Sequence, residues 1–156
     1  MQAEVQTSRV RTPDAPAAIG PYSQAIVANG MVFCAGQVAL DPATNDLAGH
    51  DIQTQTGRAL ENLRAVLVAA GSDLQYVVRT TVFLSKFSDF TAMNEVYERY
   101  FGEVAPARST IECGLPGHIL VQRDCSAIVP SLVSTIQVIE ARESRSTFNL
   151  DEDADF

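Results

Sequence analysis

The hydrophobic period changes several times along this chain, and each change marks a predicted element. Residues 77–84 alternate apolar and polar side chains, the period of a half-buried strand. Asn29-Gly30 separates two strand-like runs, so residues 22–40 are predicted to form a β-hairpin. Gly36 falls inside the second run, where it indicates a bulge or a close approach of the backbone.

Two segments show the spacing of amphipathic helices. Apolar residues keep helical spacing from Asp51 to Ala70, and Gly71 follows where a C-terminal cap belongs. A second helix is predicted between an N-cap at Asp89 and a stop at Gly102. Its aromatic and methionine stripe is more typical of a core face than of a cofactor site and comprises Phe90, Met93, Tyr97, Tyr100 and Phe101.

Strand-like runs at residues 109–113 and 119–129 complete the order strand, hairpin, helix, strand, helix, strand, strand. This order predicts an α+β fold in which both helices cover one face of a mixed sheet. We expect the uncovered face to be rich in valine, isoleucine and cysteine. Such a face is usually closed by another subunit, so the pattern predicts a symmetric homo-oligomer.

Length and composition indicate one globular domain. The chain has 156 residues, of which 46% are apolar and 19% charged, enough for one core and too few residues for two ordinary domains. We assign residues 1–140 to a single domain. Residues 141–156 are polar and end in an acidic run, so they are predicted to form a disordered tail.

The net charge of the chain limits the kinds of partner that it is expected to bind. The net charge is −8 and Lys86 is the one lysine, which disfavours nucleic acid because phosphate binding needs clustered Lys and Arg. The N-terminus lacks a secretion signal, and apolar runs such as residues 65–70 are too short to span a bilayer. No membrane partner is expected, and the sequence favours a cytoplasmic protein, with an organellar destination left open.

The three cysteines, Cys34, Cys113 and Cys125, have no metal-binding spacing and are odd in number. Each lies in or beside an apolar run, which predicts buried free thiols in a reducing compartment. Glycine-rich phosphate-binding patterns are absent from the sequence. Neither a cofactor nor a metal site is therefore expected.

Pro106-Ala107-Arg108-Ser109 is the stretch that carries candidate chemistry, because it places Arg108 where a loop becomes an apolar strand. The planar fork of an arginine holds a carboxylate by two parallel hydrogen bonds, so this position suits the capture of a small organic acid. The alternative is a surface arginine that pairs with a nearby acidic side chain.

Several separated blocks between residues 10 and 130 resemble the Rid (YjgF, reactive intermediate deaminase) family in order and spacing. They are Ala15-Pro16-Ala17-Ala18-Ile19-Gly20-Pro21-Tyr22-Ser23-Gln24-Ala25, Ala35-Gly36-Gln37, Asn62, Thr80-Thr81-Val82-Phe83-Leu84, Asp89-Phe90, Met93-Asn94-Glu95-Val96-Tyr97 and Pro106-Ala107-Arg108-Ser109. The resemblance implies a chorismate-mutase-like α+β fold that assembles as a homotrimer. It also implies hydrolysis of reactive 2-imino and 2-enamino acids to 2-keto acids and ammonia.

The resemblance also implies roles for single residues. Arg108 matches the arginine that clamps the substrate carboxylate, Tyr22 the tyrosine that lines the pocket, and Gly36 the glycine whose backbone faces the ligand. Thr110 occupies the place of a cysteine whose main chain contacts the ligand, and Asn94 is carried over as a substrate-binding residue. The cleft is expected to lie between subunits.

Two positions depart from the family pattern. Many members carry a water-positioning Glu within an Ile-Glu-Ile-Glu-like run, and alignment with a one-residue deletion places Gln122 there; without the deletion Arg123 would take its place. Ala35 replaces a common serine. The other titratable candidates, for which solvated or structural roles are favoured, are Glu112, Asp124, His50 and His118.

Three hypotheses follow. The first is an imine and enamine deaminase in which Arg108 holds the carboxylate and Gln122 or a substrate-held water completes the reaction. The second is a keto acid binding protein or sensor on the same trimer, without turnover. The third is an endoribonuclease or translation inhibitor, which the negative charge of the chain disfavours.

Overall fold

Six strands form one mixed sheet in the computed structural model, which describes residues 6–132. The strand order is β1-β2-β3-β6-β4-β5, and all neighbours are antiparallel except the parallel pair β4 and β5. The strands are β1 (Thr7–Val10), β2 (Ala25–Ala28), β3 (Met31–Gln37), β4 (Val77–Leu84), β5 (Ala107–Glu112) and β6 (Val121–Ile128).

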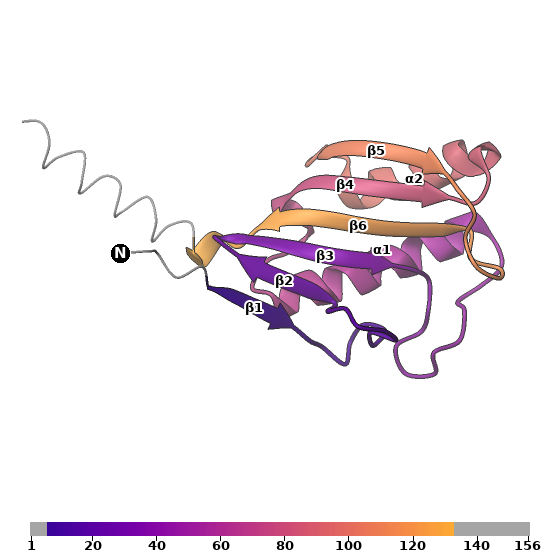
Figure 1. The fold of residues 1–156 in the computed structure, drawn as a ribbon. Coiled ribbons are helices and arrows are strands. Elements are labelled where there is room, and N and C mark those ends of the chain that lie inside the picture. The colour runs from indigo at the N-terminus through magenta and orange to yellow at the C-terminus, as the bar shows by residue number, and fades with distance from the viewer. Residues whose placement is uncertain (1–5, 133–156) are drawn as a thin grey trace, which may run out of the picture.

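Two helices, α1 (Ile52–Ala69) and α2 (Phe90–Phe101), cover one face of this sheet (Figure 1). Short 3₁₀ turns, η1 (Leu74–Tyr76) and η2 (Phe87–Asp89), lead into β4 and α2. This arrangement confirms the predicted α+β fold with both helices on one side. No helix within residues 6–132 is both long and apolar enough to cross a bilayer. The predicted boundary at residue 140 and the acidic tail lie outside the described residues.

The hairpin of β2 and β3 turns at Asn29 and Gly30, as predicted. Both residues have positive φ angles, 50° and 75°, the combination that a two-residue type I′ turn requires. β2 begins at Ala25 rather than at Tyr22, because the side chain of Gln24 holds the preceding loop. Gln24 accepts a hydrogen bond from the Thr12 N–H (2.7 Å) and donates one to the Pro16 carbonyl (2.8 Å).

The ends of the two helices follow the sequence signals in different degrees. The Asp51 carboxylate accepts the Thr54 N–H at 2.8 Å and caps α1, and Gly71 follows its C-terminus with a φ of 80°. Asp89 precedes α2 as predicted, but its side chain makes no capping hydrogen bond, because Asp89 itself is helical at the end of η2. Gly102 ends α2.

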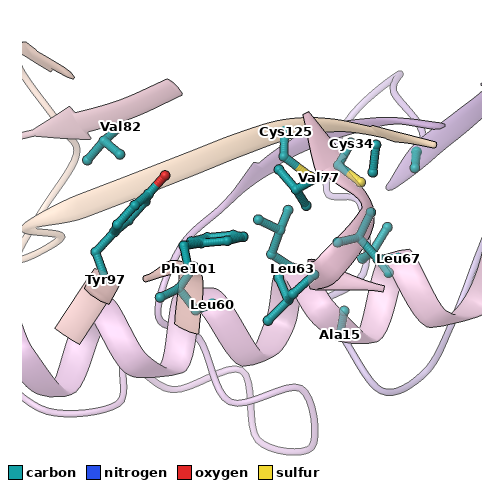
Figure 2. Packing of buried hydrophobic residues seen from close by; sticks show 14 of the residues in the cluster. Ala15, Cys34, Leu60, Leu63, Leu67, Val77, Val82, Tyr97, Phe101 and Cys125 are labelled. Carbon is teal, nitrogen blue, oxygen red and sulfur yellow. The ribbon is translucent and has the colours of Figure 1, made fainter. Parts of the chain in front are cut away.

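The core lies between the helices and the sheet (Figure 2). Leu60, Leu63 and Leu67 of α1 are fully buried against the sheet. Cys34 and Cys125 face each other across β3 and β6, and both thiols are free and buried as predicted. A hydrogen bond with Cys34, together with burial, raises the pKa of the Cys125 thiol, so it stays protonated.

The third cysteine and the open sheet face differ from expectation. Cys113 is free but only half-buried, because it follows the edge strand β5. The buried positions of β3 and β6 alternate along each strand, so their cysteines and valines turn toward the helices. The open face instead carries the half-buried polar residues of β6 and the exposed side chains of Phe33 and Ile111. An irregularity between Val77 and Arg79 also exposes Val78, which the strict alternation had placed on the same face as Thr80 and Val82.

Candidate functional site

Arg108 is the second residue of β5, and its side chain is held over α2. One guanidinium nitrogen donates a hydrogen bond to Oδ1 of Asn94 at 2.8 Å. The guanidinium carbon lies 4.7 Å from the centre of the Tyr97 ring and 5.6 Å from that of Phe90. A hydrogen bond and two aromatic contacts therefore fix the orientation of a half-buried cation.

Local structure explains why these groups meet. Arg108 pairs with Thr80 in the parallel register of β4 and β5, so it shares the helix-facing side with this buried residue. Phe90, Asn94 and Tyr97 follow one another at helical spacing and line one face of α2. The aromatic stripe that the sequence assigned to the core thus has a second role, because two of its members contact Arg108.

Arg108 has no carboxylate partner within residues 6–132, where the ion pair found joins Arg64 and Asp73. The alternative prediction, a surface arginine paired with an acidic side chain, finds no support there. Thr110 lies two residues further along β5, on the same side of the strand, and is half-buried. Arg108 and Asn94 therefore form one group, with Thr110 on the same side of β5, and the unpaired guanidinium can bind a small carboxylate.

Gly36 and Gln122 form a second group, on the open face of the sheet. A Cβ atom added to Gly36 would lie 2.4 Å from Nε2 and 2.8 Å from Cδ of Gln122, so the glycine makes room for this amide. The ladder of β3 and β6 is irregular between Cys34 and Gln37, which agrees with the bulge predicted at Gly36. Gln122, rather than Arg123, is thus the residue of β6 that lies beside the predicted ligand-facing glycine.

Arg123 points the other way, into the core. Its side chain is fully buried, and its guanidinium carbon lies 5.0 Å from the centre of the Tyr97 ring. Burial lowers the pKa of Arg123 to about 9; the Tyr97 phenol acts in the opposite direction, and the charge of Arg108 lowers this pKa further. Burial likewise raises the pKa of Tyr97, against the effect of the two arginines.

Tyr22 stands apart from both groups. It is 51% exposed, and its hydroxyl accepts a hydrogen bond from the Ile19 N–H at 3.3 Å. With Arg9, Arg11 and Ser23 it lines a surface cavity of about 380 Å³ beside β1 and β2. This cavity contains neither Arg108 nor Gln122.

The strand order keeps the predicted site residues apart within one chain. Tyr22 precedes β2, and four strand-to-strand steps of about 4.8 Å separate β2 from β5, or roughly 19 Å in all. Gln122 lies two strands from Arg108 and on the opposite face of the sheet. A small substrate cannot contact Arg108, Gln122 and Tyr22 of the same chain together.

The remaining titratable candidates show structural or exposed positions. The Glu112 carboxylate accepts a hydrogen bond from the Phe87 N–H, and the Asp124 carboxylate accepts one from the Thr81 N–H at 3.2 Å. Both carboxylates therefore stabilise the backbone of neighbouring segments. His50 and His118 are exposed, and neither lies with the two groups. Ala35, at the position of the common serine, offers no hydroxyl beside Gly36.

Sequence reasoning missed the part that Tyr97 and Phe90 play around Arg108, because contact between α2 and β5 is tertiary. It also missed the burial of Arg123. A signal for the latter was present, since Val121, Arg123 and Cys125 share one face of an alternating strand.

Comparison with known proteins gives one consistent relationship. The model of the family described as Endoribonuclease L-PSP matches residues 12–129. A RutC family protein of Synechocystis sp. is 49% identical over 78% of this chain and 96% of its own length, and the 2-iminobutanoate/2-iminopropanoate deaminase of Mus musculus is 40% identical over 76% and 89%. The crystal structure of E. coli TdcF with bound serine superposes with a TM-score of 0.73 at 35% identity, over 78% of this chain and 98% of that one.

Proposed function

Because this chain belongs to the Rid (YjgF) family, we propose that it hydrolyses reactive 2-imino and 2-enamino acids to 2-keto acids and ammonia. The observation that carries the proposal is the fixed, half-buried guanidinium of Arg108, which has no acidic partner in the described chain. A related mouse protein that is named as a deaminase of 2-imino acids adds support. Such substrates carry the carboxylate that this guanidinium suits.

The proposed reaction asks little of the protein beyond positioning. Arg108 holds the carboxylate by a bidentate pair, while Asn94 fixes the guanidinium from behind. A water oxygen forms a bond to the C=N carbon as the C=N π electrons move to nitrogen, which takes up a proton. The hydroxyl proton of the resulting carbinolamine then passes to the nitrogen as the C–N bond breaks, which releases ammonia and leaves the keto group.

Gln122 limits how the water is activated. An amide oxygen accepts a hydrogen bond from water and holds it in place, but it does not take its proton. In the proposed mechanism Gln122 therefore orients the water, and the proton passes to the substrate nitrogen. Gly36 leaves the space that Gln122 occupies.

We also propose that the site is completed by another copy of the chain, in a homotrimer as the family resemblance implies. The proposal is supported by the separation of Arg108 from Gln122 and Tyr22 in one subunit and by exposed Phe33 and Ile111 on the open face. We expect the purified protein to sediment as a trimer. A stable, monodisperse monomer at micromolar concentration would contradict a shared cleft.

Gln122 is also the observation that favours a second candidate function, a protein that binds small keto acids without turning over imines. Carboxylate capture by Arg108 does not require Gln122, whereas proton transfer would lose the group that a glutamate supplies. The RNA-directed role that the family description names finds less support, because the net charge of −8 disfavours phosphate binding.

The decisive experiment is to measure ammonia and keto acid release from freshly generated 2-iminopropanoate, with pyruvate binding measured in parallel. We expect Arg108→Ala to lower kcat/KM by about 10²-fold or more, since charge-assisted hydrogen bonds are lost. Arg108→Lys should rescue poorly, because an ammonium does not reproduce the fork. The matched control is Arg99→Ala, which removes an exposed arginine of α2. Unchanged binding and turnover in a folded Arg108→Ala protein would place the carboxylate site elsewhere.

A further inference from the structure

Arg123 is a charged group that the proposed mechanism does not use. Its side chain is 0% exposed, and none of its three guanidinium nitrogens has a hydrogen-bond partner within residues 6–132. No carboxylate of this part of the chain forms an ion pair with it. A buried and unpaired cation is strongly unfavourable, so a compensating anion is expected close by.

The position of Arg123 connects it to the carboxylate clamp. The guanidinium carbons of Arg108 and Arg123 lie 4.7 Å and 5.0 Å from the centre of the same Tyr97 ring. The two cations are therefore no further apart than these distances combined, so the field of Arg123 extends over the site of Arg108. The Tyr97 hydroxyl, which points toward the sheet in Figure 2, also lacks a hydrogen-bond partner in the described chain.

Arg123 remains cationic at neutral pH, since burial and the neighbouring charge lower its pKa only to about 9. Two of the 11 basic side chains of an acidic protein thus gather around one aromatic ring. Positive charge concentrated at one site attracts anions in proportion to their charge. The field of a buried charge is screened less than that of an exposed one.

We propose that Arg123 makes the Arg108 site selective for substrates with two carboxylates, that is, for 2-imino dicarboxylic acids and their 2-keto products. This inference rests on the proposed function. Arg108 binds the carboxylate next to the imine carbon, and the second carboxylate is stabilised by the charge of Arg123. Because Arg123 is fully buried, it acts mainly through its field, as a specificity-determining residue rather than a catalytic one.

A purely structural role explains the residue less well. The buried positions beside it on β6 are Val121 and Cys125, whose side chains are apolar or only weakly polar. An isoleucine would fill this core position without the desolvation of a charge. The fold alone therefore supplies no reason for an arginine here.

The test compares two keto acids of equal length, 2-oxoglutarate and 2-oxopentanoate, which differ by one carboxylate. The binding of both keto acids to the full-length protein is measured by calorimetry. The matching imines are generated from the corresponding amino acids by an amino acid oxidase, and their turnover is measured. The variants are Arg123→Ile and Arg123→Met, with Arg99→Met as the control that removes one exposed positive charge. Thermal unfolding is recorded for each protein.

We expect the wild-type protein to bind the dicarboxylate about tenfold more tightly than the monocarboxylate. The attraction of one unit charge at this distance has that effect in a medium of intermediate dielectric constant. Both Arg123 variants should lose this preference, keep monocarboxylate binding and unfold at a higher temperature. Arg99→Met should keep the preference.

Three results would overturn the inference. Equal binding of both keto acids by the wild type would remove the selectivity, while leaving the proposed function intact. A preference retained in Arg123→Ile and Arg123→Met would assign it to another residue, and failure of both variants to fold would make the charge a structural need. If the wild type neither bound a keto acid nor turned over either imine, the proposed function itself would fail.

Discussion

Replacing Gly36 by alanine tests the contact between Gly36 and Gln122, the residue that we propose orients the water. The φ angle of Gly36 lies outside the left-handed region, so the backbone accepts an alanine. The new methyl group, however, would lie 2.4 Å from Nε2, 2.8 Å from Cδ and 3.0 Å from Cγ of Gln122. The outer atoms of the flexible, half-buried Gln122 side chain must therefore move, and holding this side chain away from its preferred rotamer costs about 0.5–1.5 kcal/mol.

The same substitution should stabilise the protein when Gln122 is shortened. In a Gln122→Ala background all three close atoms are absent, so Gly36→Ala retains only its effect on the unfolded chain, a gain of about 0.4–1 kcal/mol. A double-mutant cycle should then give a coupling free energy of about 0.5–1.5 kcal/mol. Gly114→Ala is the control, because nothing lies within 4 Å of its added Cβ.

The assay is denaturant unfolding of the four proteins at one fixed concentration, with kcat and KM for an imine substrate measured alongside. Gly36→Ala should lower kcat more than it raises KM, since it displaces Gln122 but leaves Arg108 in place. A coupling free energy near zero, with Gly36→Ala as stable as the wild type, would refute the placement of Gln122 against Gly36.

Two further predictions concern titratable groups. Gln122→Glu should raise kcat for 2-iminopropanoate by about 10²- to 10⁴-fold if the water lacks a general base, and it should weaken keto acid binding by charge repulsion; a slower enzyme in steady-state kinetics would show that another group activates the water. The Thr54 hydrogen bonds lower the pKa of Asp51 in the folded state, so the unfolded chain binds the proton more tightly and the cap's contribution is lost as pH falls below about 4. Asp51→Asn should remove this part of the pH dependence of thermal unfolding, and an unchanged profile would exclude the cap as its source.

The parts of the fold that the sequence predicted well depend on local chemistry. Asn29-Gly30 sets a turn by its positive φ angles, and Gly71 follows the C-terminus of α1 with a φ of 80°. The prediction failed where tertiary contacts override the hydrophobic period of the sequence. The irregularity in β4 turns the Val78 side chain to the surface. The side-chain amide of Gln24 forms hydrogen bonds with Thr12 and Pro16 of the preceding loop, so β2 begins only at Ala25.

The site shows the same limit at a larger scale. Arg108, Gly36 and Gln122 could be named from their sequence blocks, but their separation over two faces of a sheet depends on the strand order, which brings β6 between β3 and β4. The contacts of Arg108 with Asn94 and Tyr97 likewise require α2 to pack beneath β5. Alternation alone could have placed Arg123 in the core, yet a charged residue at a buried position conflicts with the usual composition of cores.

On the proposed function, carboxylate binding and hydrolysis depend on different parts of the structure. Arg108 and its aromatic contacts belong to the helix-covered side, where packing holds a guanidinium rigidly, whereas Gln122 and Gly36 belong to the open face. Gln122 and Arg123 are adjacent in β6 but project to opposite faces of the sheet. Substitutions at these two positions are therefore expected to affect hydrolysis and binding separately. On the proposed function, replacing the glutamate of the family pattern by Gln122 reduces proton transfer, while the neighbouring arginine adds charge to the binding side. If both proposals hold, these two departures favour selection among anionic substrates over fast general-base hydrolysis.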